Sequence, residues 1–246
     1  MAGHSKWANI RHRKERQDSK RGKVYTKMIR EITVAAHAGG NPDDNPRLRN
    51  AMDKALDANM SRDVIDRAIK RGAGGLEGAD MEEVHYEGYG PYGIAVIVES
   101  MTNNRNRTVA EVRHVFSEYD GNLGAEGSVS YLFKKQGQIT FSPGTPEDQV
   151  MEIALEAGAE DVVVNEDQSI DVMTTPENFL SVKKQITAKG LQIAQAEIAM
   201  IPVTFISLEK KEEAQQVEEF LEELEDLDDV QVVYSNADIA EEERTT

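Results

Sequence analysis

Cysteine is absent from this 246-residue chain, which excludes disulfides, thiolate zinc sites and cysteine nucleophiles. The chain also has no apolar run approaching the ~18 residues that a membrane span needs. Its first residues carry charges, but the apolar stretch of a secretory signal does not follow them. These absences predict a cytoplasmic protein with no membrane partner.

Signatures of catalysis and cofactor binding are equally scarce. The histidines include no pair spaced four residues apart and no cluster with carboxylates at metal-ligand spacing; they are His4, His12, His37, His85 and His114. Gly88, Gly90 and Gly93 match G-x-G-x-x-G, but Pro91 removes a backbone N–H and a strand-like segment follows. We interpret these glycines as a hairpin turn, and we expect no enzymatic activity, metal, cofactor or small-molecule substrate.

Charge is distributed unevenly along the chain. Residues 1–78 contain 17 Lys/Arg and 10 Asp/Glu, a net charge of +7, whereas residues 79–246 carry −24. The first 30 residues alone have ten basic and two acidic residues. A basic segment on an acidic body indicates a part that binds a polyanion beside a part that repels it.

Apolar residues at three- and four-residue spacing predict helices in the first third of the chain, beginning with a run within residues 18–38. The dipeptide Asn45-Pro46 is typical of a helix start, and Ser61 is a candidate N-cap for a third helix. The Gly-rich run at 72–80 indicates a domain boundary. Residues 1–78 are therefore expected to form a basic N-terminal arm and a small helical bundle.

Beyond that boundary, short strands alternate with helices. Residues 135–200 have the pattern strand-helix-strand-strand-helix-strand, the order of a ferredoxin-like domain. Residues 79–134 and 201–240 supply a discontinuous middle α/β domain, including strands expected at 127–133 and 202–208. The sequence thus predicts an α+β fold, in which an N-terminal helical bundle is followed by two ferredoxin-like α/β sandwich domains, one inserted in the other.

The basic segment is the strongest candidate for a functional site. On a helix beginning near residue 18, one stripe of cations lies beside the apolar face; it consists of Lys20, Lys23, Lys27 and Arg30. Such a stripe can follow a phosphate backbone, whereas the alternative, a solvated helix face, usually alternates in sign. The predicted nucleic-acid-binding residues are Lys6, Trp7, Arg11, Arg13, Lys14, Arg16, Lys20, Arg21, Lys23, Lys27 and Arg30. Trp7 suits stacking on a base and equally an anchor onto the helical bundle.

A second candidate anion site lies in the segment TNNRNRT at residues 102–108. Arg105 and Arg107 fall where a helix should begin, and cations at that end oppose the helix dipole. Two guanidinium groups beside a helix N-terminus suit an anion. The alternative, favoured when these two residues are taken alone, is that they form salt bridges to the acidic body.

Several of these blocks together resemble the YebC/PmpR family. The resemblance is carried by AGHSKWANI, REITVAAHAGG, NPRLRNAMDKALDANM, YEGYGPYGIAVIVE, TNNRNRT and GNLGAEGSVSYLF, which are dispersed over residues 2–133. It implies a non-enzymatic three-domain protein, with one helical and two α/β domains, that acts in gene expression. The family's label implies a DNA-binding transcriptional regulator. Some members imply the alternative, a ribosome-associated translation activator that binds rRNA.

The residues themselves do not decide between DNA and RNA. The sequence indicates no recognition helix with Asn, Gln or Arg at its N-terminus and no dimer seam to match a palindromic site. A basic arm with a single aromatic residue suits structured RNA at least as well as DNA. The expected partner is therefore nucleic acid, either DNA or rRNA of the ribosome, and a monomer is favoured.

Overall fold

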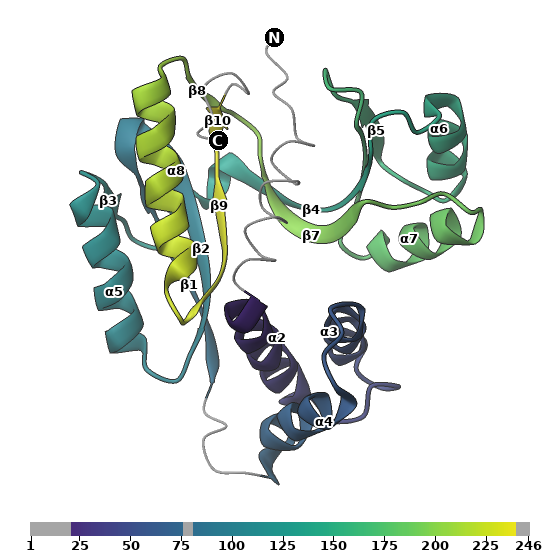
Figure 1. Cartoon of the computed structure of the whole chain (residues 1–246), viewed down its shortest axis with the longest axis horizontal. Helices are drawn as coiled ribbons and strands as arrows, with labels where there is room; N and C mark the ends of the chain where they lie inside the picture. Colours follow the sequence, from purple (N-terminus) through teal and green to yellow (C-terminus); the bar gives the residue numbers. More distant parts are fainter. Residues whose placement is uncertain (1–20, 76–80, 240–246) are drawn as a thin grey trace. The chain divides into compact units, whose positions relative to one another are not determined.

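The computed structural model describes residues 21–75 and 81–239, in which helices and largely antiparallel sheets confirm the α+β class (Figure 1). Packing divides the described chain into two units. One contains residues 21–128 and 218–233, and the other contains residues 129–217 and 234–239. The domain boundaries expected at residues 78, 134 and 200 stay predictions.

Between residues 21 and 70 the chain forms three α-helices: α2 (Arg21–Ala36), α3 (Pro46–Asp57) and α4 (Arg62–Lys70). Asn45 caps α3 as predicted, because its Oδ1 accepts a hydrogen bond from Leu48 N at 3.0 Å. Its Nδ2 also donates to the carbonyl of Ala35 at 2.7 Å, which fixes the turn between α2 and α3. Ser61 is the N-cap residue of α4, although its side chain makes no capping hydrogen bond. The apolar faces of the three helices share one core, with Ile32, Leu48 and Ile65 fully buried.

The first sheet has the strand order β3-β1-β2-β9. Its strands are β1 (Glu82–Tyr89), β2 (Ala95–Thr102), β3 (Asn122–Leu123) and β9 (Val230–Ser235), and its helices are α5 (Arg105–Glu118) and α8 (Lys211–Asp226). Helix α5 connects β2 to β3 while β1 lies between them, which is a split β-α-β arrangement. The rings of Phe116 on α5 and Phe220 on α8 pack edge to face, with centroids 5.1 Å apart.

The second four-stranded sheet has the order β5-β6-β4-β7, which is the ferredoxin-like arrangement expected for residues 135–200. Its elements are β4 (Phe133–Phe141), α6 (Glu147–Glu156), β5 (Asp161–Val164), β6 (Ile170–Thr174), α7 (Phe179–Ala188) and β7 (Gln195–Pro202). Buried residues of strands and helices, including Phe141, Val150 and Ile186, form its core. The βαββαβ order read from the sequence is therefore confirmed.

Two expected strands are wrong. Residues 130–132 form a short 3-10 turn, and the strand begins only at Phe133 and continues to Phe141 as β4. It is longer than its apolar residues indicate because Phe133 through Thr140 pair continuously with β7, whose last residue is Pro202. The strand expected at 202–208 is reduced to β8 (Ile206–Leu208), which pairs in parallel with β10 (Ala237–Ile239) in a separate two-stranded sheet.

Candidate nucleic-acid interface

Helix α2 carries the part of the predicted nucleic-acid interface that the structure describes. Lys23, Lys27 and Arg30 lie along one side of it, because steps of four and three residues keep side chains on one helix face. Arg21 is the first residue of this helix. The other predicted binding residues lie outside the described residues; they are Lys6, Trp7, Arg11, Arg13, Lys14, Arg16 and Lys20.

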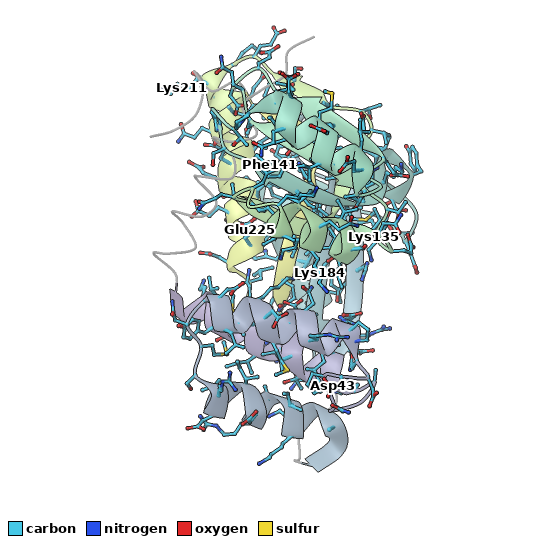
Figure 2. All side chains as sticks on the ribbon, turned by 90° about the vertical axis from the view of Figure 1, so that its right-hand side faces the viewer. Asp43, Lys135, Phe141, Lys184, Lys211 and Glu225 are labelled. Carbon is cyan, nitrogen blue, oxygen red and sulfur yellow. The ribbon has the colours of Figure 1, made fainter. Side chains whose placement is uncertain are left out.

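Lys23, Lys27 and Arg30 contact the last residues of α8 or the loop that follows it. Lys23 Nζ donates to the carbonyl oxygen of Asp226 at 3.0 Å, and Lys27 Nζ donates to that of Glu225 at 3.0 Å. Arg30 donates to the carbonyl oxygen of Asp228, in the loop that follows α8. Figure 2 labels Glu225 in the last turn of this helix. The described part of the predicted cationic stripe is thus in contact with acceptors of the same chain.

The charge distribution of α8 explains these contacts. The last carbonyls of a helix have no intrahelical donors and form the negative end of its dipole. The last turn of α8 contains no basic residue of its own, and the carboxylate of Asp226 lies 3.5 Å from Lys23 Nζ. Cations from α2 therefore supply the positive charge that the end of α8 lacks.

Asp229, three residues beyond α8, is the most buried charged group of this region, with a side chain 2% exposed. Its Oδ2 accepts hydrogen bonds from the hydroxyls of Thr102 at 3.0 Å and Thr108 at 2.7 Å, and from Nη2 of Arg107 at 2.6 Å. Its Oδ1 lies 3.1 Å from Nη1 of Arg30. We call these five residues the Asp229 cluster, and two arginines together compensate its single buried carboxylate.

The pKa of Asp229 follows from these contacts. Burial alone raises the pKa of its carboxyl group, because a charge is poorly solvated there. The hydrogen bonds from Arg107, Thr108 and Thr102, with the charge of Arg30, outweigh that effect and lower the pKa below its ordinary value of 3.8. Asp229 is therefore ionised at neutral pH, and the cluster is a set of charge-assisted hydrogen bonds.

Arg105 and Arg107, the second candidate anion site, lie in the first turn of α5 as expected from the sequence. Asn104 caps this helix by accepting a hydrogen bond from the backbone N–H of Arg107 at 3.1 Å. Arg107 reaches Asp229, whereas Nε of Arg105 lies 2.9 Å from Oε1 of Glu82 on β1. Both side chains thus have carboxylate partners, which is the salt-bridge alternative to an anion site. Binding of an anion at this helix end stays a prediction.

Sequence reasoning missed Asp229 and a second pair of arginines. Asp229 stands among several acidic residues, and nothing local to it indicates that its carboxylate is buried. Arg47 and Arg49 lie in the first turn of α3, both exposed, and Arg47 forms an ion pair with Glu83. The sequence does contain a pattern that could have identified this pair: two arginines closely follow a helix-capping Asn, as they also do at the start of α5.

Other expectations concern absences. Within residues 21–75 and 81–239, no group of acidic residues and histidines is arranged to hold a metal ion. Among the helices of that same part of the chain, none is long and apolar enough to cross a membrane. Gly90 and Gly93 lie in the hairpin turn between β1 and β2, in which Tyr92 and Gly93 have positive φ angles of 58° and 77°. Gly88, which was also expected in the turn, is instead a residue of β1 and pairs with Val96 of β2.

Comparisons with known proteins agree with this architecture. Residues 5–75 match the model of the TACO1/YebC protein N-terminal domain, and residues 81–237 match that of the TACO1/YebC second and third domain. The chain is 61% identical over 243 residues to a protein from Pseudomonas aeruginosa named "Transcriptional regulatory protein PmpR", covering 98% of each chain. It is 62% identical over 243 residues, again 98% of each chain, to a protein from Nitrosococcus oceani named "Probable transcriptional regulatory protein". A crystal structure of a conserved hypothetical protein from Aquifex aeolicus superposes with a TM-score of 0.81 at 48% identity, covering 91% of this chain and 93% of that one.

Proposed function

Because the chain belongs to the TACO1/YebC family, we propose that it is a non-enzymatic, nucleic-acid-binding regulator of gene expression, and specifically a DNA-binding transcriptional regulatory protein of the cytoplasm. The observation that carries the proposal is the segregation of charge. Residues 1–78 carry +7 and the remainder carries −24. Lysine and arginine side chains that neutralise phosphates supply the sequence-independent part of nucleic-acid affinity.

The charge distribution also suggests how nucleic acid is oriented on the protein. The acidic remainder of the chain repels phosphates, so contact is restricted to the basic arm and to the α2 cations that follow it. In the proposed complex, Lys20, Lys23, Lys27 and Arg30 meet successive phosphates, and the residues of the arm extend that row. Arg105 and Arg107, which are paired with Glu82 and Asp229, stay a second candidate anion site at the start of α5.

A second candidate function is rRNA binding by a ribosome-associated translation factor. Trp7, the only tryptophan of the chain, lies within the basic arm, between Lys6 and Arg11. Aromatic side chains stack on the splayed bases of structured RNA more readily than on the paired bases of a DNA duplex. This observation favours RNA for the arm, while the names of the relatives favour transcription.

Lysate sedimentation and promoter footprinting together test the two functions. Full-length protein and a variant without residues 1–20 are compared on gradients of fixed salt concentration. Footprinting of a defined promoter at physiological salt, without co-migration with ribosomal particles, is the result expected for the transcriptional regulator. Arm-dependent co-migration with ribosomal particles, together with DNA binding that lacks sequence preference, would overturn that assignment in favour of rRNA.

A charge-matched variant provides the control. Lys135 on β4 and Lys184 on α7 are exposed lysines in the other unit, and both are labelled in Figure 2. Lys135→Ala/Lys184→Ala lowers the net charge as much as Lys20→Ala/Lys23→Ala does. If only Lys20→Ala/Lys23→Ala loses nucleic-acid binding, the α2 stripe is a specific binding surface. Equal loss of binding in the two variants would show that only total charge matters.

A further inference from the structure

Lys23, Lys27 and Arg30 make one contact within the protein and are proposed to make another with nucleic acid. Hydrogen bonds and ion pairs join Lys23, Lys27 and Arg30 of α2 to a group of acidic residues that we call the acidic α8 end. This group consists of Glu225, Asp226, Asp228 and Asp229. These cations are also the described part of the stripe that is proposed to contact phosphates. An N–H group that donates to the acidic α8 end is not available to a phosphate, and the contact holds the side chain beside that end, so the two contacts compete.

The acidic α8 end resembles a phosphate backbone in its chemistry. It offers negatively charged or partially negative oxygens, from carboxylates and from the final helix carbonyls, to cations three and four residues apart on α2. A phosphodiester chain offers a row of anionic oxygens to the same lysines and arginine. A phosphodiester chain can therefore replace the oxygens of the acidic α8 end as the partner of these side chains.

We propose that the acidic α8 end is a latch, which holds the α2 cations until nucleic acid displaces it. The inference rests on the proposed nucleic-acid binding and adds a regulatory step to it. In the latched state the α2 stripe is engaged, and only a polyanion of high charge density competes for it. Short or weakly charged anions leave the latch closed, so the contact limits binding to long nucleic acid.

The exposure of the three cations sets the order of release. The Lys23 side chain is 45% exposed and is the closest of the three to the basic arm in sequence, whereas the Arg30 side chain is 19% exposed. Exposed ion pairs contribute little to stability and are screened by salt. A polyanion bound by the arm therefore displaces Asp226 from Lys23 first and reaches Arg30, which is also paired with buried Asp229, last.

Neutralising the latch provides the first test. Asp226→Asn/Asp228→Asn removes two carboxylates of the acidic α8 end and leaves Asp229 intact. Glu209→Gln/Glu212→Gln makes the same change of charge at the other end of α8, roughly 20 Å away by helix rise and beyond the Debye length at physiological salt. We expect the first variant to bind a 30-base-pair DNA duplex or an RNA hairpin about threefold to tenfold more tightly than the control variant. Equal affinities in the two variants would overturn the latch.

Locking the latch provides the second test. Thr26 on α2 and Leu227 after α8 line the same small cavity, and the natural chain has no cysteine, so Thr26→Cys/Leu227→Cys introduces the only two thiols. A short bis-maleimide should join them in the full-length protein, and an excess of heparin should reduce the yield. The cross-linked protein should bind the same duplex or hairpin about tenfold more weakly than Thr26→Cys treated identically.

The outcomes separate this inference from the function on which it rests. Failure to cross-link, or unchanged affinity after cross-linking, refutes the latch while nucleic-acid binding stands. Absence of binding by wild type, by Asp226→Asn/Asp228→Asn and by the unlinked double-cysteine protein at low salt refutes the proposed function, and the latch with it.

Discussion

Nη2 of Arg107 lies 2.6 Å from Oδ2 of Asp229, a residue 122 positions later in the chain. The second oxygen of the same carboxylate lies 3.1 Å from Nη1 of Arg30. One buried side chain thereby joins α2, the start of α5 and the loop before β9. Such a buried ion pair matters for stability mainly because removal of one partner leaves the other charge buried without a counter-charge.

Asp229→Ala should strongly destabilise the protein. The substitution leaves Arg107, Arg30 and the buried hydroxyls of Thr102 and Thr108 without their shared acceptor. Removing one partner of such a buried set costs about 3–5 kcal/mol. Urea unfolding followed by circular dichroism measures the change. The control is Asp228→Ala, because the Asp228 side chain is exposed; its free energy of unfolding should stay within about 0.5 kcal/mol of wild type. An equally small change in Asp229→Ala would contradict the role assigned to the Asp229 cluster.

The stability contributed by Asp229 should depend on pH. The pKa of its carboxyl group lies below the ordinary 3.8 in the folded protein, because the opposing effect of burial is outweighed by Arg107, Thr108, Thr102 and Arg30. The ionised form is thus favoured by folding, and its contribution is complete above the unfolded pKa of about 4. As pH falls through the lower folded pKa, that contribution is lost. The free energies of unfolding of wild type and Asp229→Asn should therefore converge below pH ~4, and a constant difference from pH 7 to pH 3 would contradict the lowered pKa.

Tyr119 should ionise at unusually high pH. Burial, followed by its 2.9 Å hydrogen bond to Oε2 of Glu223 and by the charges of Glu223, Glu219 and Glu118, raises the pKa of its hydroxyl from 10.0 to about 12. The neutral form is favoured by folding, so this contribution to stability is complete below pH 10 and is lost as pH rises through about 12. Absorbance titration of wild type against Tyr119→Phe isolates this group. Glu223→Gln should move the transition toward lower pH, and a Tyr119 titration near pH 10 in the wild type would show that the contact is not maintained.

Gly90 should not tolerate a side chain. A Cβ atom on Gly90 would lie 2.5 Å from Cε1 of Phe220, a fully buried ring packed against Phe116. Overpacking of this kind costs about 1–3 kcal/mol. Gly22→Ala is the matched control, because a Cβ atom on Gly22 meets no atom within 4 Å and alanine favours the helix by up to about 1 kcal/mol. Thermal unfolding should thus shift in opposite directions for the two variants, and a neutral Gly90→Ala would show that the Phe220 ring moves aside.

The cationic stripe should determine the salt dependence of nucleic-acid binding. Replacing Lys20 and Lys23 by alanine should reduce the slope of log K against log salt by about 0.9 for each phosphate of a DNA duplex that the variant no longer neutralises. Fluorescence anisotropy at several salt concentrations measures the slope. Lys135→Ala/Lys184→Ala should leave it unchanged, and an unchanged slope in both variants would show that Lys20 and Lys23 do not neutralise phosphates.

Much of the architecture could be predicted from the sequence because its causes are local. The helix start at Asn45-Pro46 follows from one side chain that caps its own helix. The βαββαβ order of residues 135–200 follows from alternating periodicities, which each segment carries within itself. The uneven charge is likewise a property of composition. Strand ends were less predictable, since β4 begins at Phe133 through its pairing with β7, some 60 residues away, rather than through its own pattern.

The sequence by itself determined that α2 carries a stripe of cations and that four of the five residues 225–229 are acidic. Only the tertiary structure decided that Lys23, Lys27 and Arg30 meet the end of α8, about 200 residues later, and that Asp229 alone among those acids is buried between two arginines. The physical reason is that helix periodicity arises from contacts three and four residues apart. The partner of a surface charge depends instead on how distant segments pack, and many acidic residues of this chain would satisfy the same arginine equally well.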